Sequence, residues 1–256
     1  RKSLTDGAAV CDLGCGTGVL GLMCLEAGAA RVVAIDRTPI LDIARQNFAR
    51  AGYSDRVELV PHVSYRHTLA ERVDAVICDH IGCFGFDYDL IGILQDARHR
   101  FLKPGGHIMP RSMNLYTGLV QSQACHDRAE AWARPDVPEA FHWVRDYCVN
   151  EKHLVSMSKD EMLSDGALIA SINLTLDAPE SFFWSASLTA VRSGTVHGIG
   201  GWFEAELAQG IWMTNSPHSP DAIGRGRAFM PIGEPVDVSA GEHVDVAQHL
   251  GVIDAG

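Results

Sequence analysis

Apolar and polar positions follow two different patterns along this chain, and the pattern changes near Pro110. Before Pro110, short apolar runs alternate with segments in which apolar residues recur at helical spacing. This strand–helix alternation is typical of a doubly wound, mostly parallel sheet, so we expect a Rossmann-like α/β domain over residues 1–110. The expected strands cover residues 8–13, 31–35, 56–60, 73–78 and a stretch from 107, and the expected helices cover residues 19–27, 39–51 and 90–102.

After Pro110, apolar residues occupy every second position in most segments, with glycine and proline between them. A period of two indicates strands with one buried face, and many such strands in succession predict an antiparallel sheet or barrel. We therefore expect a β-barrel-like substrate domain over residues 111–256, with helices only near 126–133 and 141–147. The alternating segments are residues 112–120, 168–176, 183–191, 196–207, 211–214 and 228–232.

Three glycines on alternate positions, Gly14, Gly16 and Gly18, follow the first expected strand and open the first expected helix. Glycine lets the backbone adopt left-handed dihedral angles and approach a ligand closely. The spacing differs from the G-x-G-x-x-G motif of dinucleotide sites, whose last position is Val19 here. Asp12, just before the glycines, would repel a phosphate but could receive an ammonium group.

A second carboxylate, Asp36, ends the second expected strand, where it could bind both hydroxyls of a ribose. Ligands of open α/β sheets lie beyond the carboxyl ends of the strands, where Asp12, Asp36 and Asp79 are all expected. The alternative is an ordinary tight turn in which Asp12 and Asp36 are solvated loop acids.

Composition narrows the classes of partner. The net charge of −11 argues against non-specific nucleic-acid binding, and it suits a neutral or cationic substrate as well as ordinary solubility. We expect no membrane partner, because no apolar run approaches the ~20 residues of a membrane helix, and we find no signal peptide. The seven cysteines show no C-x-x-C pair, which predicts reduced thiols, no metal site and a cytoplasmic protein. The chain begins with Arg1, and we expect a segment of the natural protein to precede it.

Six segments in order along the chain resemble the protein arginine methyltransferases, a family of class I S-adenosylmethionine-dependent methyltransferases. The resemblance implies a methyltransferase domain followed by a β-barrel, with S-adenosylmethionine as the cofactor and the substrate in the cleft between the domains. The segments are residues 12–20 (Asp-Leu-Gly-Cys-Gly-Thr-Gly-Val-Leu), 26–36, 101–110, 196–204, 214–220 and 241–242.

The resemblance also implies a set of cofactor-binding residues in the glycine motif, at the end of the second strand and after the third. Ser64 stands where the family has a glutamate near the adenine. The residues of this set are Asp12, Gly14, Cys15, Gly16, Gly18, Asp36, Val63 and Ser64.

Both substrate-binding loops of the family are altered. Two glutamates after the fourth strand hold the substrate guanidinium in the family. Here the first is Asp79, and the second position is Tyr88, flanked by Asp87 and Asp89. The family's threonine-histidine-tryptophan loop aligns with residues 222–224, which contain no histidine. Because paired carboxylates fix a guanidinium, these changes argue against an arginine substrate.

We predict catalytic or substrate-binding roles for Asp79, His80, Asp87, Tyr88 and Asp89. His80 could be a general base or a wall of the cleft. Tyr88 could bind substrate or pack against neighbours. Asp87 and Asp89 could contact substrate or stabilise a helix N-terminus.

The leading hypothesis is a methyltransferase acting on a non-standard nucleophile of a small molecule or peptide natural product. The alternative is protein arginine N-methylation, and a third possibility is a catalytically silent, cofactor-binding scaffold or regulatory partner. The resemblance further implies a homodimer formed through an arm at residues 126–152, whose aromatic residues would anchor the interface.

Overall fold

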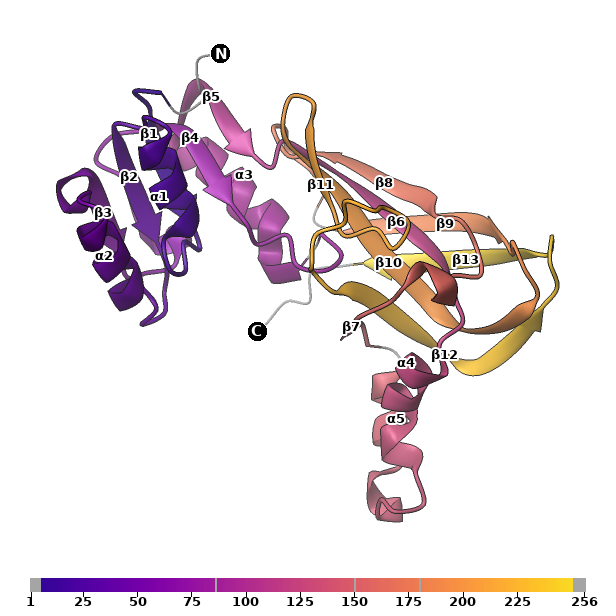
Figure 1. The fold of residues 1–256 in the computed structure, drawn as a ribbon. Helices are drawn as coiled ribbons and strands as arrows, with labels where there is room; N and C mark the ends of the chain where they lie inside the picture. Colours follow the sequence, from indigo (N-terminus) through magenta and orange to yellow (C-terminus); the bar gives the residue numbers. More distant parts are fainter. Residues whose placement is uncertain (1–5, 86, 150, 180, 251–256) are drawn as a thin grey trace.

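The computed structural model describes residues 6–85, 87–149, 151–179 and 181–250. A parallel sheet with its helices forms one part of the molecule, and a larger antiparallel β domain forms the other (Figure 1). In the described part of the chain, no helix is both long and apolar enough to cross a membrane. The strands are β1 (Ala9–Leu13), β2 (Arg31–Ile35), β3 (Val57–Val60), β4 (Val73–Cys78), β5 (Leu102–Met109), β6 (Ser112–Val120), β7 (His153–Val155), β8 (Ala167–Asn173), β9 (Phe182–Thr189), β10 (Gly194–Ala208), β11 (Ile211–Thr214), β12 (Arg227–Val238) and β13 (His243–Leu250). The α-helices are α1 (Val19–Glu26), α2 (Leu41–Arg50), α3 (Leu90–Arg100), α4 (Gln123–Ala129) and α5 (Val144–Cys148).

The five-stranded sheet has the order β3-β2-β1-β4-β5, and all neighbouring strands are parallel. Alternate residues of a strand point to opposite faces. Val10 and Val32 therefore pack with α1 and α2, whereas Cys11 and Val33 pack with α3 on the other face. The doubly wound α/β domain predicted from the sequence is thus confirmed. The order of connection reverses between β1 and β4, and ligands of such sheets bind at this reversal.

The boundary between α3 and β5 differs from the prediction. The helix ends at Arg100, and β5 begins at Leu102 rather than near His107. The segment that contains Pro104 fits into the strand because β5 is an edge strand whose pairing with β4 shifts register there. An edge position tolerates a proline that cannot donate a ladder hydrogen bond, and glycines permit the irregularity.

The second domain contains a sheet with the order β7-β12-β10-β6-β8, to which β11 adds beside β10, and a separate β9–β13 pair. All of these pairs are antiparallel, which confirms the predicted antiparallel β-barrel-like domain. The helix expected over residues 141–147 is instead a 3₁₀ turn at Glu139–Phe141 followed by α5. The predicted domains and arm also include residues 1–5, 86, 150, 180 and 251–256, which lie outside the described residues.

The two domains share one hydrophobic core. The cluster that covers the α3 face of the parallel sheet continues through Ile81 and Phe84, in the loop after β4, into Met113 and Phe203 of the β domain. Phe84 packs so closely on Gly201 of β10 that a Cβ there would collide with its ring. The loop after β4 is therefore held between the two domains, which positions its polar side chains.

Candidate functional site

The glycine turn after β1 takes the backbone conformation that its residues favour. Gly14, Gly16 and Gly18 have φ angles of 68°, 52° and 83°, in the region where glycine meets no steric penalty. The N–H groups of Gly14 and Cys15 donate to the carbonyl of Ile35, at 2.8 and 3.1 Å. The turn is consequently fastened across the end of β2.

Asp36, immediately after β2, lies beside this turn. Its Oδ2 accepts a hydrogen bond from the Gly16 N–H at 3.0 Å, and its Oδ1 accepts from the Thr38 N–H and hydroxyl at 2.8 and 2.7 Å. These bonds fix the carboxylate at the carboxyl end of the sheet. Since a carboxylate has about four lone-pair sites, Asp36 keeps capacity for further donors.

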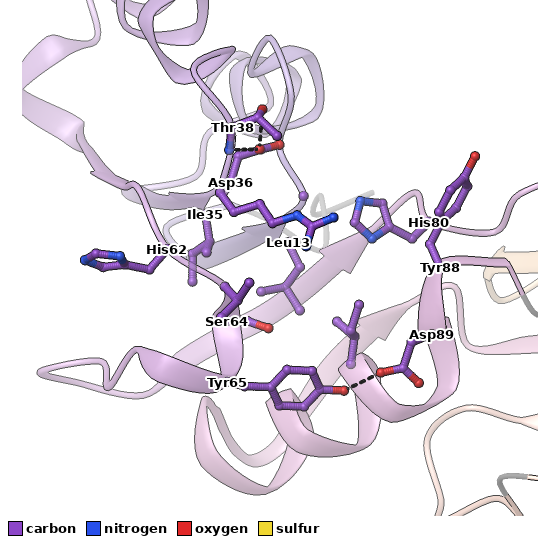
Figure 2. A pocket seen from close by; sticks show the side chains of 14 residues that line it. Leu13, Ile35, Asp36, Thr38, His62, Ser64, Tyr65, His80, Tyr88 and Asp89 are labelled. Atoms are coloured by element: carbon purple, nitrogen blue, oxygen red, sulfur yellow. Dashed lines mark hydrogen bonds between the residues drawn. The ribbon is translucent and has the colours of Figure 1, made fainter. Parts of the chain in front are cut away.

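A cavity of about 540 Å³ opens over the carboxyl ends of the central strands. Its volume falls within the ~300–1,000 Å³ range of sites that take small molecules and cofactors. Figure 2 shows Asp36 with Thr38 on one side, the Tyr65–Asp89 pair on another, and Leu13 between them in this view. The cavity thus combines an apolar floor with a few fixed polar groups, which is the composition of a cofactor pocket.

Asp12 does not line this cavity. Its side chain is only 1% exposed, and its Oδ2 accepts a hydrogen bond from the Gly21 N–H of α1 at 2.9 Å. Burial raises the pKa of Asp12 to about 7, an effect that the Gly21 hydrogen bond partly opposes. Asp12 therefore fastens the glycine turn to the start of α1. Cys15 is likewise buried, in the core beneath α1 and α2, where burial raises its thiol pKa to about 12.

The raised pKa of Asp12 predicts a pH-dependent stability. The folded chain holds a proton on Asp12 between about pH 4 and 7 that the unfolded chain releases, so this contribution to stability is lost as pH rises to about 7. Asp12→Asn removes the titration and retains an acceptor for Gly21. We expect the variant to lose less stability between pH 5 and pH 8, the difference approaching about 1.4 kcal/mol per pH unit at most. Urea unfolding of both proteins at pH 5 and pH 8 measures this difference. An equal change in the free energy of unfolding in the two proteins would contradict the prediction.

Asp79, the residue after β4, binds an arginine of the β domain. Arg225 Nη2 donates to both carboxylate oxygens, at 3.0 and 2.9 Å, and Arg225 Nη1 reaches the carbonyl of Gly82 at 3.5 Å. The Asp79 side chain remains 50% exposed. Asp79 is not among the residues around the cavity, and its charge is directed toward the β domain.

The other acids of this loop have partners as well. Asp87 Oδ2 accepts from the N–H groups of Cys83 and Phe84, at 2.7 and 3.0 Å, and its Oδ1 accepts from Lys152. Asp87 therefore stabilises the turn of its own loop.

Asp89 lies at the rim of the cavity and accepts a hydrogen bond from the Tyr65 hydroxyl at 2.7 Å. Tyr88 and Asp89 have φ angles of 60° and 57°, a left-handed conformation that is costly for side chains of this kind. Tyr88 is 74% exposed and also borders the cavity. The two residues immediately precede α3, and both of their side chains border the opening of the cavity.

His80 points away from Asp79. Its imidazole packs over Gly14 so closely that a Cβ on Gly14 would collide with the ring. Its Nδ1 is buried and has no hydrogen-bond partner among the described residues. The sequence predicted catalytic or substrate-binding roles for both Asp79 and His80, but the backbone directs the first toward the β domain and the second into the cavity.

The structure thus divides the predicted site residues into two groups. The glycine turn contributes mainly backbone geometry, whereas the cavity is bordered by side chains from four successive strand ends. The predicted residues around the cavity are Gly14, Asp36, Val63, Ser64, His80, Tyr88 and Asp89. The predicted residues that lie elsewhere are Asp12, Cys15, Gly16, Gly18, Asp79 and Asp87.

Several residues of the site had not been predicted. Tyr65, which directly follows Ser64, borders the cavity and donates a hydrogen bond to Asp89. Thr38 could have been found from its position two residues after Asp36, where the backbone N–H commonly donates to an aspartate side chain. No local pattern singles out Arg225 as the partner of Asp79.

Asn215 connects the site loop to the β domain. It is fully buried, its Nδ2 donates to the carbonyls of Cys83 and Gly226 at 2.8 and 2.7 Å, and its Oδ1 accepts from the Phe203 N–H at 2.9 Å. One side chain therefore sets the distance between the loop that carries Asp79 and the loop that carries Arg225. The sequence had drawn attention to its segment, residues 214–220, but not to this role.

The first domain matches a known family. The family model for a methyltransferase domain matches residues 10–106, which span the glycine turn, Asp36 and the loop after β4.

The curated relatives extend the similarity into the β domain. The "Arginine N(omega)-methyltransferase" of Streptomyces achromogenes subsp. streptozoticus is 27% identical, over 99% of this chain and 71% of the relative. The "Probable protein arginine N-methyltransferase 6" of Arabidopsis thaliana is 26% identical, over 91% of this chain and 56% of the relative. The chain thus spans little more than half the length of the plant protein.

Solved structures share the two-domain fold. A Trypanosoma brucei PRMT1 enzyme-prozyme heterotetrameric complex with AdoHcy aligns with a TM-score of 0.82 and 22% identity, over 94% of this chain and 78% of that chain. Arabidopsis thaliana protein arginine methyltransferase 10 aligns with a TM-score of 0.83 and 20% identity, over 96% and 80%. The chain therefore carries a class I S-adenosylmethionine-dependent methyltransferase domain, and across both domains it resembles the protein arginine methyltransferases.

Proposed function

We propose that this protein transfers the methyl group of S-adenosylmethionine to a non-standard nucleophile of a small molecule or peptide, rather than to the guanidinium of a protein arginine. The cofactor supplies an electrophilic methyl group on a sulfonium. The protein must then position a nucleophile with a free lone pair, because geometry governs the rate of such a displacement.

The cofactor would lie in the cavity over the parallel sheet. Asp36 would accept hydrogen bonds from the ribose, and Val63 and Ser64, which also border the cavity, would lie beside the adenine. Gly14 offers its backbone without a side chain, although the ring of His80 now covers it. His80 would therefore contact the amino-acid part of the cofactor or move aside for it.

The proposal on the acceptor depends chiefly on the loop after β4. A grip on guanidinium needs two carboxylates, and this loop offers one that is bound neither by the backbone of the loop nor by Tyr65, namely Asp79. Asp87 is engaged by two backbone N–H groups and Lys152, and Asp89 binds Tyr65. Tyr88, at the position of the family's second glutamate, carries no charge. A neutral hydroxyl or amine acceptor needs only one such carboxylate to orient it.

Arginine N-methylation is the second candidate. The names of the relatives favour it, in particular the Streptomyces "Arginine N(omega)-methyltransferase". The half-exposed carboxylate of Asp79 also already binds one guanidinium, that of Arg225.

A panel of acceptors tests the proposal. Free arginine, a glycine- and arginine-rich peptide, and small molecules with hydroxyl or amine groups are incubated with the enzyme and methyl-labelled cofactor. We expect label in a hydroxyl or amine acceptor and little in either arginine compound. Efficient methylation of the peptide would establish the second candidate instead, and cofactor binding without transfer to any acceptor would favour a silent scaffold.

We also propose that the protein forms a homodimer through the arm. The segment from α4 to α5 projects from the β domain (Figure 1). Trp143 and Tyr147 are 61% and 64% exposed, and their rings lie edge to face at 5.5 Å. Arg145 ties the arm to its base through Glu130 and the carbonyl of Gly233. Exposed aromatic residues on a fixed support are typical of interface anchors.

Light scattering tests the dimer. At micromolar concentration we expect twice the chain mass of 27.7 kDa, and Trp143→Ser should shift the protein toward the monomer by removing an apolar anchor. Phe183→Ser, at an exposed aromatic residue of β9 outside the arm, is the matched control and should leave the mass unchanged. A monomer mass for the unchanged protein would contradict the proposal.

We propose a cytoplasmic location. The cysteines are free in the structure, and reduced thiols are typical of that compartment.

The net charge of −11 further disfavours nucleic acid as a non-specific partner.

A further inference from the structure

The pair formed by Asp79 and Arg225 joins the two domains at the candidate substrate side. Both oxygens of the carboxylate bind the same guanidinium nitrogen, and the two residues are 146 positions apart in the chain. The Arg225 side chain is only 27% exposed, so it is partly enclosed between the loop after β4 and the segment before β12.

Hydrogen bonds fix the two chain segments that carry Asp79 and Arg225. Asn215, fully buried, donates to Cys83 in the Asp79 loop and to Gly226 beside Arg225. The segment of Arg225 is further fixed by the Ile223 N–H, which donates to the Thr214 carbonyl at 2.8 Å. The two charged groups therefore face each other before any ligand arrives, and their pairing costs less ordering than an ion pair between free side chains.

We propose that Arg225 is a specificity-determining residue, an internal guanidinium that keeps guanidinium acceptors from Asp79. This inference rests on the proposed function, which places the acceptor at that carboxylate. A tethered group competes as if present at an effective concentration on the order of millimolar. An arginine ligand must displace Arg225 or lie beside it, where two positive charges repel each other.

A neutral acceptor does not have to displace Arg225 in order to reach Asp79. Two Asp79 lone-pair sites bind Arg225, and a carboxylate has about four, so a hydroxyl or amine can still donate to Asp79 while Arg225 stays in place. The class of acceptor that fits is thus an uncharged hydrogen-bond donor.

Removing the internal guanidinium tests the inference. Arg225→Met keeps most of the side-chain volume and removes the charge, and Arg225→Gln is a second variant should the first fail to fold. L-arginine is titrated into each protein saturated with S-adenosylhomocysteine, by calorimetry. We expect binding at least about tenfold tighter than to the unchanged protein. Arg45→Met, which removes an exposed arginine paired with Asp42 on α2, should change nothing.

A second substitution shows where the arginine binds. Adding Asp79→Asn to Arg225→Met should abolish the gain, because the freed carboxylate is then absent. Unchanged arginine affinity in a folded Arg225→Met protein with normal cofactor affinity would overturn the inference, as would a gain that survives Asp79→Asn. Methyl transfer is measured separately. A gain in arginine binding without transfer to any acceptor would refute the proposed function and leave the role of Arg225 intact.

Discussion

Asp79→Asn should bind the cofactor almost as well as the unchanged protein and transfer methyl groups on the order of 100-fold more slowly. The substitution keeps the shape of the side chain and removes the only carboxylate of its loop that is not committed to its own backbone or to Tyr65. Asp79 lies outside the cavity, so cofactor contacts remain. An acceptor that is no longer oriented shifts by about 1 Å, and such a shift costs roughly 10²-fold in rate.

Asp42→Asn is the matched control, since Asp42 is an exposed acid that also pairs with an arginine, on α2. It should transfer methyl groups at the normal rate. Transfer is measured with labelled cofactor at saturating acceptor, and cofactor affinity by calorimetry. Full activity of Asp79→Asn would remove Asp79 from the mechanism.

Asp36→Ala should weaken S-adenosylhomocysteine binding by about ten- to a hundredfold. Hydrogen bonds to a charged group contribute about 1.5–3 kcal/mol, and 1.4 kcal/mol corresponds to a factor of ten. The loss has two sources. The ribose would lose its proposed acceptor, and the glycine turn would lose the bond that joins the Gly16 N–H to the carboxylate.

Thr38→Val is the matched control, because it removes one donor to Asp36 and leaves the carboxylate and its bond to Gly16 in place. We expect at most a few-fold change in affinity for that variant. Thermal unfolding of both variants shows whether the fold is intact. Equal cofactor affinity for Asp36→Ala and the unchanged protein would remove Asp36 from the binding site.

Local features of the chain determined the first domain. The apolar runs and helical periodicity predicted its alternating order, and the three glycines predicted a turn that takes left-handed dihedral angles. These predictions succeeded because the responsible interactions lie within a strand, a helix or a turn. The start of β5 was missed because an edge strand accepts Pro104, and a strand's place in a sheet is not a local property.

The β domain was predicted as a class but not in its pairing. Alternation marked the strands, yet β10 pairs with β6 and β12 across long stretches of chain, and β9 with β13 forms a separate pair. Which strands become neighbours depends on the faces that they bury together. The order of the strands is therefore set by the packing of the whole domain.

By itself, the sequence determined which residue types stand at the strand ends, and its resemblance to the methyltransferases indicated the class of cofactor. Only the tertiary structure decided where their side chains point. Asp12 turned into the core and His80 onto Gly14, because the backbone direction at each strand end is set by packing. Arg225 met Asp79 across 146 residues because Asn215 and the shared core bring the two domains together, and no local pattern encodes such a contact.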